Sequence, residues 1–563
     1  MKCMVAFNKL TLGLVLPRLC QGLKVMIHSD LGTASHVKPL FEIGNVLIQR
    51  NHTISYAAPD TNKRYAKGYP FDFYSLGKPM LDPLILMDFK DRIKANTDLE
   101  NDILMTPNLA TLLAQSYNAI YPRLTSLVLA VKPDVLICEF MSPVCRDVAI
   151  IQQIPLITGL QTTDGFGLID SPLTTTSMHF KAITIDTLSF YQRFIEKVVL
   201  PLKNFKDYHQ AKYAINKARR NNGVPPSSPF GDLSSTLAIA NTFVGFEAAV
   251  PLTPNLKLVG PIRPNSTDPL TPELTDFLTS HTSVVYVAFG SLLTPSHRDI
   301  TNIIQGALTA LDNGTIDGII WGLSKITIND FPETFTVNNK HIKAKALFDG
   351  SHPHVKLLSW APQTSILNHP STRIFISHGG LESTFEAILS TTPMLCIPFL
   401  ADQPRNALKV EAAGIGKYMP RTKANPELIT HTIQDILDDA SGEIKVNMRR
   451  MYTLAQQGTR RKAEAADAIE DYVATAKECR PFQPHSYYDI ACEAKHLIPA
   501  RMSYIQASLI DVYSAAALVS IIGIATTIYS IHALLATPSP HQNPSRARNP
   551  STYLSNPHQP PKC

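Results

Sequence analysis

Between residues 360 and 403, polar side chains that can bind a sugar nucleotide recur at short, fixed intervals. An apolar run at residues 373–377 has the character of a buried strand and ends in His378-Gly379-Gly380. Glycines allow a tight turn and a close approach of the backbone to a ligand. The helix expected next would present free N–H groups and the positive end of its dipole, which suit a phosphate. The segment therefore predicts a phosphate-binding turn between a strand and a helix.

Further polar residues follow at spacings that bring them to the same place. Ser383 and Glu386 lie three residues apart, so they share one face of the expected helix. A second apolar run at residues 393–399 leads to Asp402 and Gln403. In open α/β sheets, ligands bind at the carboxyl ends of the strands. We therefore expect a site for a nucleotide diphosphate and its sugar at one edge of a sheet.

This arrangement resembles the signature of the UDP-glycosyltransferases, an inverting family that includes plant glucosyltransferases and animal glucuronosyltransferases. The family pattern runs W-x-P-Q, then H, then H-x-G-x-x-S-x-x-E, then P, then D-Q. The matching residues are Trp360, Pro362, Gln363, His369, His378, Gly380, Ser383, Glu386, Pro393, Pro398, Asp402 and Gln403. One position departs from the pattern: Glu382 stands where the family usually has Asn, and a carboxylate there would repel a phosphate unless it points away.

The resemblance implies a role for each donor-site residue. Trp360 would stack on the uracil, because an aromatic face covers a flat base and excludes water. Gln363 would fix the ribose or the base, and Glu386 would accept hydrogen bonds from the ribose hydroxyls. The remaining candidates are His378, Gly380 and Ser383 for the pyrophosphate, Asp402 and Gln403 for the transferred sugar, and Ser291, which follows an apolar strand ending in F-G, for a phosphate.

In such enzymes, a histidine in the first loop of the amino-terminal domain is the general base, and His36 occupies that position. A neutral imidazole can take the proton of an acceptor hydroxyl as that hydroxyl attacks the anomeric carbon. A carboxylate usually orients the ring. The candidate is Glu139, at the end of the apolar run 135–138, where the family usually has Asp. Asp134, at the other end of that run, is the weaker alternative.

The implied reaction inverts the anomeric centre by direct displacement. Negative charge grows on the departing UDP, and the helix dipole after Gly380 would stabilise it together with His378 and Ser383. The sequence contains no C-x-x-C, no H-E-x-x-H and no paired His or Cys at zinc spacing. We therefore expect no metal and no cofactor other than the UDP-sugar donor.

The elements that position these residues are those of a GT-B fold, which the resemblance implies: two Rossmann-like α/β domains facing each other across a cleft. The order of strand, loop, helix and strand over residues 24–58 is Rossmann-like, without the G-x-G-x-x-G fingerprint. Between the two domains we expect a linker, and its prolines exclude an interior helix or a central strand there. The expected segments are a weak signal segment at residues 1–23, an acceptor-binding domain at 24–246, the linker at 247–282, a donor-binding domain at 283–476, a juxtamembrane segment at 477–511, a transmembrane helix at 512–536 and a disordered tail at 537–563.

Residues 512–536 contain no Asp, Glu, Lys or Arg and are long enough to cross a bilayer of about 30 Å. The basic residues on the two sides balance, so the positive-inside rule does not orient the span. The resemblance to animal members implies a single-pass protein of the endoplasmic reticulum with a lumenal body. The sequons at Asn51, Asn265 and Asn313 are compatible with that placement.

The composition adds three expectations. The net charge of +6 over 563 residues gives no case for a nucleic-acid partner. The eight cysteines are scattered and predict no disulfide framework. Aromatic residues are frequent at positions 165–224, and we expect most of them to pack as the apolar faces of amphipathic helices.

Three functions stay open. The first is a UDP-glycosyltransferase acting on a small lipophilic acceptor such as a sterol, lipid or xenobiotic. A neutral hexose is favoured because, apart from Arg405, no arginine lies near Asp402 to bind the carboxylate of a glucuronyl group. The second is a membrane protein that binds a UDP-sugar but has lost catalysis through Glu139 and Glu382. The third, a double-Rossmann enzyme such as a sugar-nucleotide epimerase, fits the motif run and the span poorly. A hydrogen bond between His36 and Glu139 would favour the first.

Overall fold

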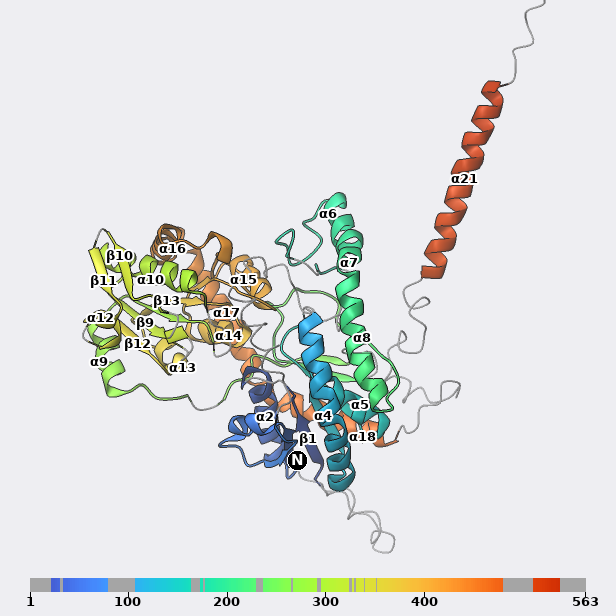
Figure 1. Cartoon of the computed structure of the whole chain (residues 1–563), viewed down its shortest axis with the longest axis horizontal. Coiled ribbons are helices and arrows are strands. Elements are labelled where there is room, and N and C mark those ends of the chain that lie inside the picture. Colours follow the sequence, from blue (N-terminus) through green and yellow to red (C-terminus); the bar gives the residue numbers. More distant parts are fainter. Residues whose placement is uncertain are drawn as a thin grey trace, which may run out of the picture. The chain divides into compact units, whose positions relative to one another are not determined.

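The computed structural model describes most of the chain (Figure 1). The described residues are 22–30, 34–78, 107–163, 173–175, 178–228, 236–264, 267–290, 295–323, 327–328, 331–338, 340–350, 352–478 and 510–536. They belong to two compact units, one ending at Leu497 and one beginning at Ile498. Most of the predicted signal segment and juxtamembrane segment, and all of the predicted disordered tail, lie outside the described residues.

The first lobe is built on a parallel sheet. Its strands are β1 (Lys24–His28), β2 (Thr53–Ala58), β3 (Asp72–Ser75), β4 (Val135–Glu139), β5 (Leu156–Leu160), β6 (Leu237–Ala240) and β7 (Leu256–Leu258). The seven described strands lie in the order β3-β2-β1-β4-β5-β6-β7 and pair in parallel throughout. Runs such as KVMIH and VLICE form its centre because parallel strands covered on both faces are apolar without alternation.

Helices cover both faces of this sheet. Helices α2 (Ala34–Gln49) and α18 (Lys462–Glu478) share one buried cluster with the strands. Helices α4 (Pro107–Val131), α5 (Pro143–Ile151) and α8 (Phe205–Asn221) pack on the other face. The chain therefore leaves the first lobe and later returns to it through α18, which an ion pair of 2.7 Å between Lys462 and Glu42 joins to α2.

The second lobe repeats the design with strands β8 (Val284–Ala288), β9 (Gly318–Gly322), β12 (Val355–Leu358), β13 (Thr372–Ser377), β14 (Met394–Cys396) and β15 (Gly416–Tyr418). The parallel order β12-β9-β8-β13-β14-β15 is again that of a Rossmann sheet. Its covering helices are α9 (Pro272–Ser280), α10 (His297–Asp312), α12 (Lys345–Phe348), α13 (Gln363–Leu367), α14 (Leu381–Ser390), α15 (Gln403–Ala412), α16 (Pro426–Asp438) and α17 (Glu443–Thr459). A small antiparallel pair, β10 (Thr334–Val337) and β11 (Lys340–Lys343), lies beside α10.

The proline-rich linker of the sequence, residues 247–282, contains ordered elements. Strand β7 is the edge strand of the first sheet, and α9 begins with Pro272 at its first position. An edge strand and a first helical turn are the places that tolerate proline. The first sheet thus continues past residue 246, and the two lobes are joined by the short stretch between β7 and α9.

The aromatic residues of the middle region do not pack as expected. Phe190 and Tyr191 of helix α6 (Phe190–Phe194) are 76% and 68% exposed, and Phe205 of α8 is 58% exposed. Helices α6, α7 (Leu200–Lys203) and α8 continue one another as a column (Figure 1). The expectation of amphipathic packing was wrong here: the buried residues of α8 begin at Ala211, and Ala218 belongs to the buried cluster that α8 shares with α4.

The second unit contains α21 (Ile510–Ala536). Residues 510–535 have a mean hydropathy of 1.9 in their most apolar window, so this helix is long and apolar enough to cross a membrane. It includes the predicted span and begins two residues earlier.

Candidate active site

His36 and Glu139 meet at the switch point of the first sheet. His36 lies in the first turn of α2, which follows β1, and Glu139 ends β4, the strand hydrogen-bonded to β1. Nδ1 of His36 is 2.8 Å from Oε1 of Glu139, which is the contact that the enzyme hypothesis requires. The carboxylate is buried, whereas the imidazole is 25% exposed, so the ring remains accessible from outside the lobe. Asp134, at the far end of β4, instead accepts the N–H of Lys24.

Acidic residues of the second lobe interact electrostatically with this imidazole. Burial lowers the pKa of His36, but the charge and hydrogen bond of Glu139 raise it, and the net pKa lies above the ordinary 6.5. Asp402 and Glu382, both from the second lobe, contribute to that rise. Burial in turn raises the pKa of Asp402, while a hydrogen bond from Asn406 and the charge of His36 lower it. The candidate base His36 and the candidate sugar-binding residue Asp402 therefore interact electrostatically, although they belong to different lobes.

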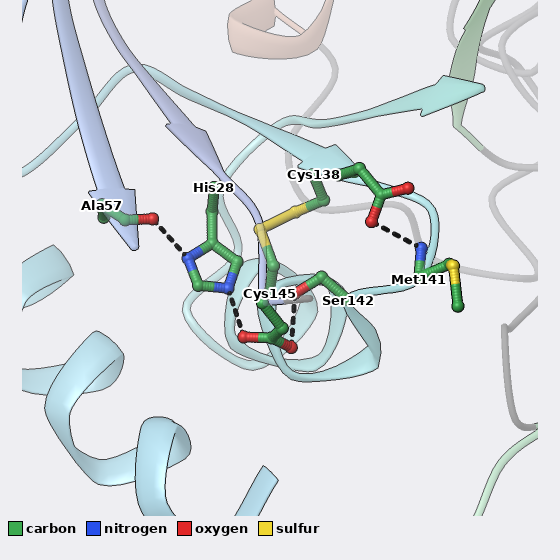
Figure 2. Close-up of a disulfide and its surroundings, with 8 residues drawn as sticks. His28, Ala57, Cys138, Met141, Ser142 and Cys145 are labelled. Carbon is green, nitrogen blue, oxygen red and sulfur yellow. Dashed lines mark hydrogen bonds and ion pairs between the residues drawn. A yellow bond between two sulfur atoms is a disulfide. The ribbon is translucent and has the colours of Figure 1, made fainter. Parts of the chain in front are cut away.

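A rigid turn holds Glu139 in place. Its second oxygen, Oε2, accepts the N–H of Met141 at 3.0 Å. The next helix, α5, is joined to β4 by a disulfide between Cys138 and Cys145 (Figure 2). The expectation that the cysteines form no disulfide was wrong at this pair. The two cysteines are seven residues apart, and only the strand–turn–helix geometry brings them together.

Below the disulfide lies a buried polar network that the sequence did not reveal. Nδ1 of His28 donates to the carbonyl oxygen of Ala57 at 2.8 Å, and Nε2 lies 2.9 Å from Oδ1 of Asp30 (Figure 2). The hydroxyl of Ser142 donates to the other oxygen of Asp30 at 2.8 Å. The network ties the end of β1 to the turn after β4, and thereby the base of the His36 loop to the Glu139 turn.

In the second lobe, the predicted phosphate-binding turn lies between β13 and α14. Gly379 has a φ of +77°, which favours glycine. A Cβ on Gly380 would lie 2.4 Å from Nε2 of His378, so only glycine fits against that ring. Burial lowers the pKa of His378 to about 4, and this histidine is neutral at physiological pH. The N-terminus of α14 is thus held beside an uncharged imidazole.

The predicted nucleoside residues lie around α13 and α14. Trp360 is 74% exposed and offers a free aromatic face. Gln363, the first residue of α13, donates to Ser383 at 3.2 Å and to Glu386 through a shorter bond. Its carbonyl accepts the hydroxyl of Tyr286 at 3.3 Å. Gln363, Ser383 and Glu386 therefore form one hydrogen-bonded group, in which Ser383 and Glu386 share one face of α14 as their spacing predicted.

An arginine that the sequence did not single out joins this group. Arg263, just after β7, donates to Glu386 at 2.5 Å and to the hydroxyl of Thr364 at 2.9 Å. Its other nitrogen is 3.4 Å from Glu382, which also accepts from Asn241 at 2.8 Å. Burial raises the pKa of Glu382 to about 7, with Arg263 opposing that rise and Glu386 adding to it. The sequence contained one signal for such a partner: Glu382 and Glu386 are four residues apart on one helix, and two neighbouring carboxylates require a cation.

The other predicted residues have these places. Asp402 is the residue directly before α15, and its carboxylate accepts a hydrogen bond from the Asn406 amide at 2.7 Å. Gln403 is buried, and its carbonyl accepts the N–H groups of Phe399 and Leu400 at 3.0 and 3.2 Å. Ser291 lies outside the described residues. Within the residues that the structure describes, no group of three or more His, Cys, Asp or Glu side chains is arranged to hold a metal ion.

The chain is similar to known proteins over most of its length. A family model described as UDP-glucoronosyl and UDP-glucosyl transferase matches residues 125–457. A UDP-glycosyltransferase of Talaromyces amestolkiae is 27% identical over 511 residues, which are 87% of this chain and 94% of that protein. UDP-glucuronosyltransferase 3A2 of Mus musculus is 27% identical over 280 residues, 49% of each chain.

Solved structures show the same fold. A UDP-glucosyltransferase from Polygonum tinctorium aligns with a TM-score of 0.55 at 18% identity, covering 80% of this chain and 99% of its own. The calicheamicin glycosyltransferase CalG4 aligns with a TM-score of 0.53 at 16% identity, over 82% and 100% of the two chains. These are GT-B glycosyltransferases, and the two lobes described above have that fold.

Proposed function

Because the chain belongs to the UDP-glycosyltransferase family, we propose that it transfers a hexosyl group from a UDP-sugar to a hydroxyl of a small lipophilic acceptor, with inversion. The chain is a glycosyltransferase. The class of acceptor and the inversion of the anomeric centre are what we propose. The observation that carries the proposal is the 2.8 Å contact between His36 and Glu139. The imidazole of His36 also interacts electrostatically with Asp402.

In this mechanism, Glu139 accepts the Nδ1–H of a neutral His36, which leaves the Nε2 lone pair free. Nε2 takes the proton of the acceptor hydroxyl as its oxygen bonds to the anomeric carbon. The bond from that carbon to the UDP oxygen breaks, and its electron pair leaves with UDP. The resulting imidazolium lies beside the buried carboxylate of Glu139, which stabilises it.

The donor site would hold UDP without a formal positive charge from His378. The low pKa of that histidine leaves the amino end of α14 to stabilise the phosphates. The exposed Trp360 is available to cover the uracil, and the Glu386 carboxylate is available to bind the ribose hydroxyls. Asp402 and Gln403 would then bind hydroxyls of the sugar.

A neutral hexose remains the favoured donor sugar. Arg405, the one arginine near Asp402 in the sequence, donates to the hydroxyl of Thr175 at 2.9 Å and to the carbonyl of Ile183 at 3.0 Å. A guanidinium so engaged is poorly placed to pair with the carboxylate of a glucuronyl group. This supports glucose or a similar neutral sugar.

The experiment is a donor panel with the full chain in detergent micelles or nanodiscs. UDP-glucose, UDP-galactose, UDP-N-acetylglucosamine and UDP-glucuronic acid are each combined with a set of lipophilic alcohols and phenols. Products are identified by mass, and the anomeric configuration is measured by NMR. Turnover that His36→Ala abolishes supports the proposal. UDP binding without transfer from any donor would leave the alternative, a donor-binding membrane protein without catalysis.

We further propose that α21 anchors the protein as a single-pass membrane protein of the endoplasmic reticulum with the two lobes in the lumen. The disulfide supports this, because disulfides persist in oxidising compartments. Asn51 and Asn313 are exposed acceptors for glycans in that compartment. A mobility shift on glycosidase treatment tests the placement, and an unglycosylated, protease-accessible body in intact microsomes would overturn it.

A further inference from the structure

Arg263 occupies an unusual place in the donor lobe. It belongs to the stretch that joins the lobes, yet its side chain is only 15% exposed and lies between two carboxylates of α14. Its contacts are Glu386 at 2.5 Å, Thr364 at 2.9 Å and Glu382 at 3.4 Å. No family motif in the sequence includes this residue.

A second residue fixes the same junction. Asn241, directly after β6, accepts the N–H of Ile262 through its side-chain oxygen at 2.7 Å. Its amide donates to Glu382 at 2.8 Å. Asn241 thus holds the backbone next to Arg263 and the carboxylate that Arg263 approaches. The first lobe, the joining stretch and the start of α14 are connected through these hydrogen bonds.

The two carboxylates need such a cation. Glu382 and Glu386 lie at i and i+4 on one helix face, where like charges repel. Glu382 is in the first turn of α14, the place where a diphosphate would add further negative charge. An arginine fork can pair with both carboxylates at once, which a single point charge does less well.

We propose, on the basis of the donor site described above, that Arg263 is a positioning residue for the UDP-sugar. It neutralises Glu382 beside the diphosphate and holds the Glu386 carboxylate in place for the ribose hydroxyls. Glu382, which departs from the family pattern, is then one half of a charge pair and does not repel the donor. Arg263 and Glu382 together take the place of the Asn that the family pattern usually has.

UDP binding to the full chain, measured by calorimetry, tests this. Arg263→Met removes the charge and keeps a long side chain. We expect it to weaken UDP binding by about ten- to a hundredfold at about pH 8.5, and clearly less at about pH 6, below the pKa of about 7 to which burial raises Glu382. The groups facing Glu382 are Arg263, Glu386, Asn241 and His36. Since UDP itself titrates, the relevant quantity is the ratio of variant to wild-type affinity at each pH.

The double variant Arg263→Met/Glu382→Gln separates electrostatics from structure. We expect it to recover about tenfold at the higher pH and to lose the pH dependence of the ratio. Arg263→Lys keeps the charge but not the fork, so we expect it to weaken UDP binding less than Arg263→Met does, and it is the test variant if Arg263→Met fails to fold. In turnover, the donor KM of Arg263→Met should rise while kcat changes less.

The matched control is Arg50→Met. Arg50 also bridges two carboxylates on one helix, Asp467 at 2.7 Å and Glu470 at 2.8 Å, but it joins α2 to α18 in the first lobe. We expect it to leave UDP affinity unchanged. If Arg263→Met binds UDP as tightly as wild type at both pH values, the inference is wrong while the proposed function stands. If wild type binds no UDP, the proposed function itself fails.

Discussion

Replacing Glu139 by glutamine tests the proposed base at the level of single hydrogen bonds. Each oxygen of Glu139 accepts one donor, Nδ1–H of His36 at 2.8 Å and N–H of Met141 at 3.0 Å. Glutamine has the same shape but only one acceptor oxygen, so one of these donors must face an amide NH2. If the carbonyl keeps the Met141 N–H, the NH2 donates to Nδ1 of His36. The imidazole proton then moves to Nε2, the atom that must accept the proton of the acceptor.

The size of the effect follows from the charge that is lost. A hydrogen bond to a charged group contributes about 1.5–3 kcal/mol. At about 1.36 kcal/mol for each factor of ten, losing it when the imidazolium forms lowers kcat by about 10- to 150-fold. If the imidazole is also held in the wrong tautomer, kcat falls by up to about 10⁴-fold, the upper range for general-base catalysis. The donor KM should change little, because Glu139 lies in the other lobe.

The assay is release of UDP from the donor found active, with kcat and donor KM measured separately and UDP binding measured by calorimetry. Asp134→Asn is the control, because it makes the same acid-to-amide change at the opposite end of β4. A fall in kcat of less than about threefold for Glu139→Gln, with UDP binding intact, would refute the proposed role of the dyad.

Three further outcomes are expected. Because the pKa of His36 lies above 6.5 and the base must be neutral, kcat/KM should fall as pH drops through a value above 6.5, and Glu139→Gln should move that inflection to lower pH. Lys409→Met should lower the free energy of unfolding by about 3–5 kcal/mol, measured by denaturant titration, because it leaves Glu247 buried without the Lys409 charge 2.6 Å away. A double serine variant at Cys138 and Cys145 should lose about 2.5 kcal/mol for a bridge spanning seven residues, seen as a lower Tm, and an unchanged Tm would contradict a formed disulfide.

The sequence revealed the central strands of both sheets because their physical signal is local. Residues 24–28, 135–138 and 373–377 are short runs with an apolar centre, and each forms a buried parallel strand within one residue of its expected bounds. Parallel strands that meet at a switch point bring their carboxyl ends together, so finding the strands also placed His36 beside Glu139. The chemistry assigned to these two residues stays a prediction.

Features that depend on contacts between distant segments were not predictable in the same way. The disulfide requires the turn after β4 to double back, and scattered cysteines contain no information about that turn. The exposure of Phe190 and Tyr191 depends on where their helices lie, since an aromatic side chain alone does not show which surface it meets. Both outcomes reflect the three-dimensional course of the chain and not a local pattern.

Glu382 shows how far a family pattern can guide such inference. From the sequence, a carboxylate at the start of the phosphate-binding helix is a defect, and it was one reason to consider a protein without catalysis. In the structure, its hydrogen bond from Asn241 and its ion pair with Arg263 come from segments about 140 and 120 residues away. A charge so compensated does not by itself oppose a bound diphosphate. Glu382 is therefore a weaker argument for a binding-only protein than the sequence suggested. Donor affinity should instead depend on Arg263, the residue that neutralises Glu382.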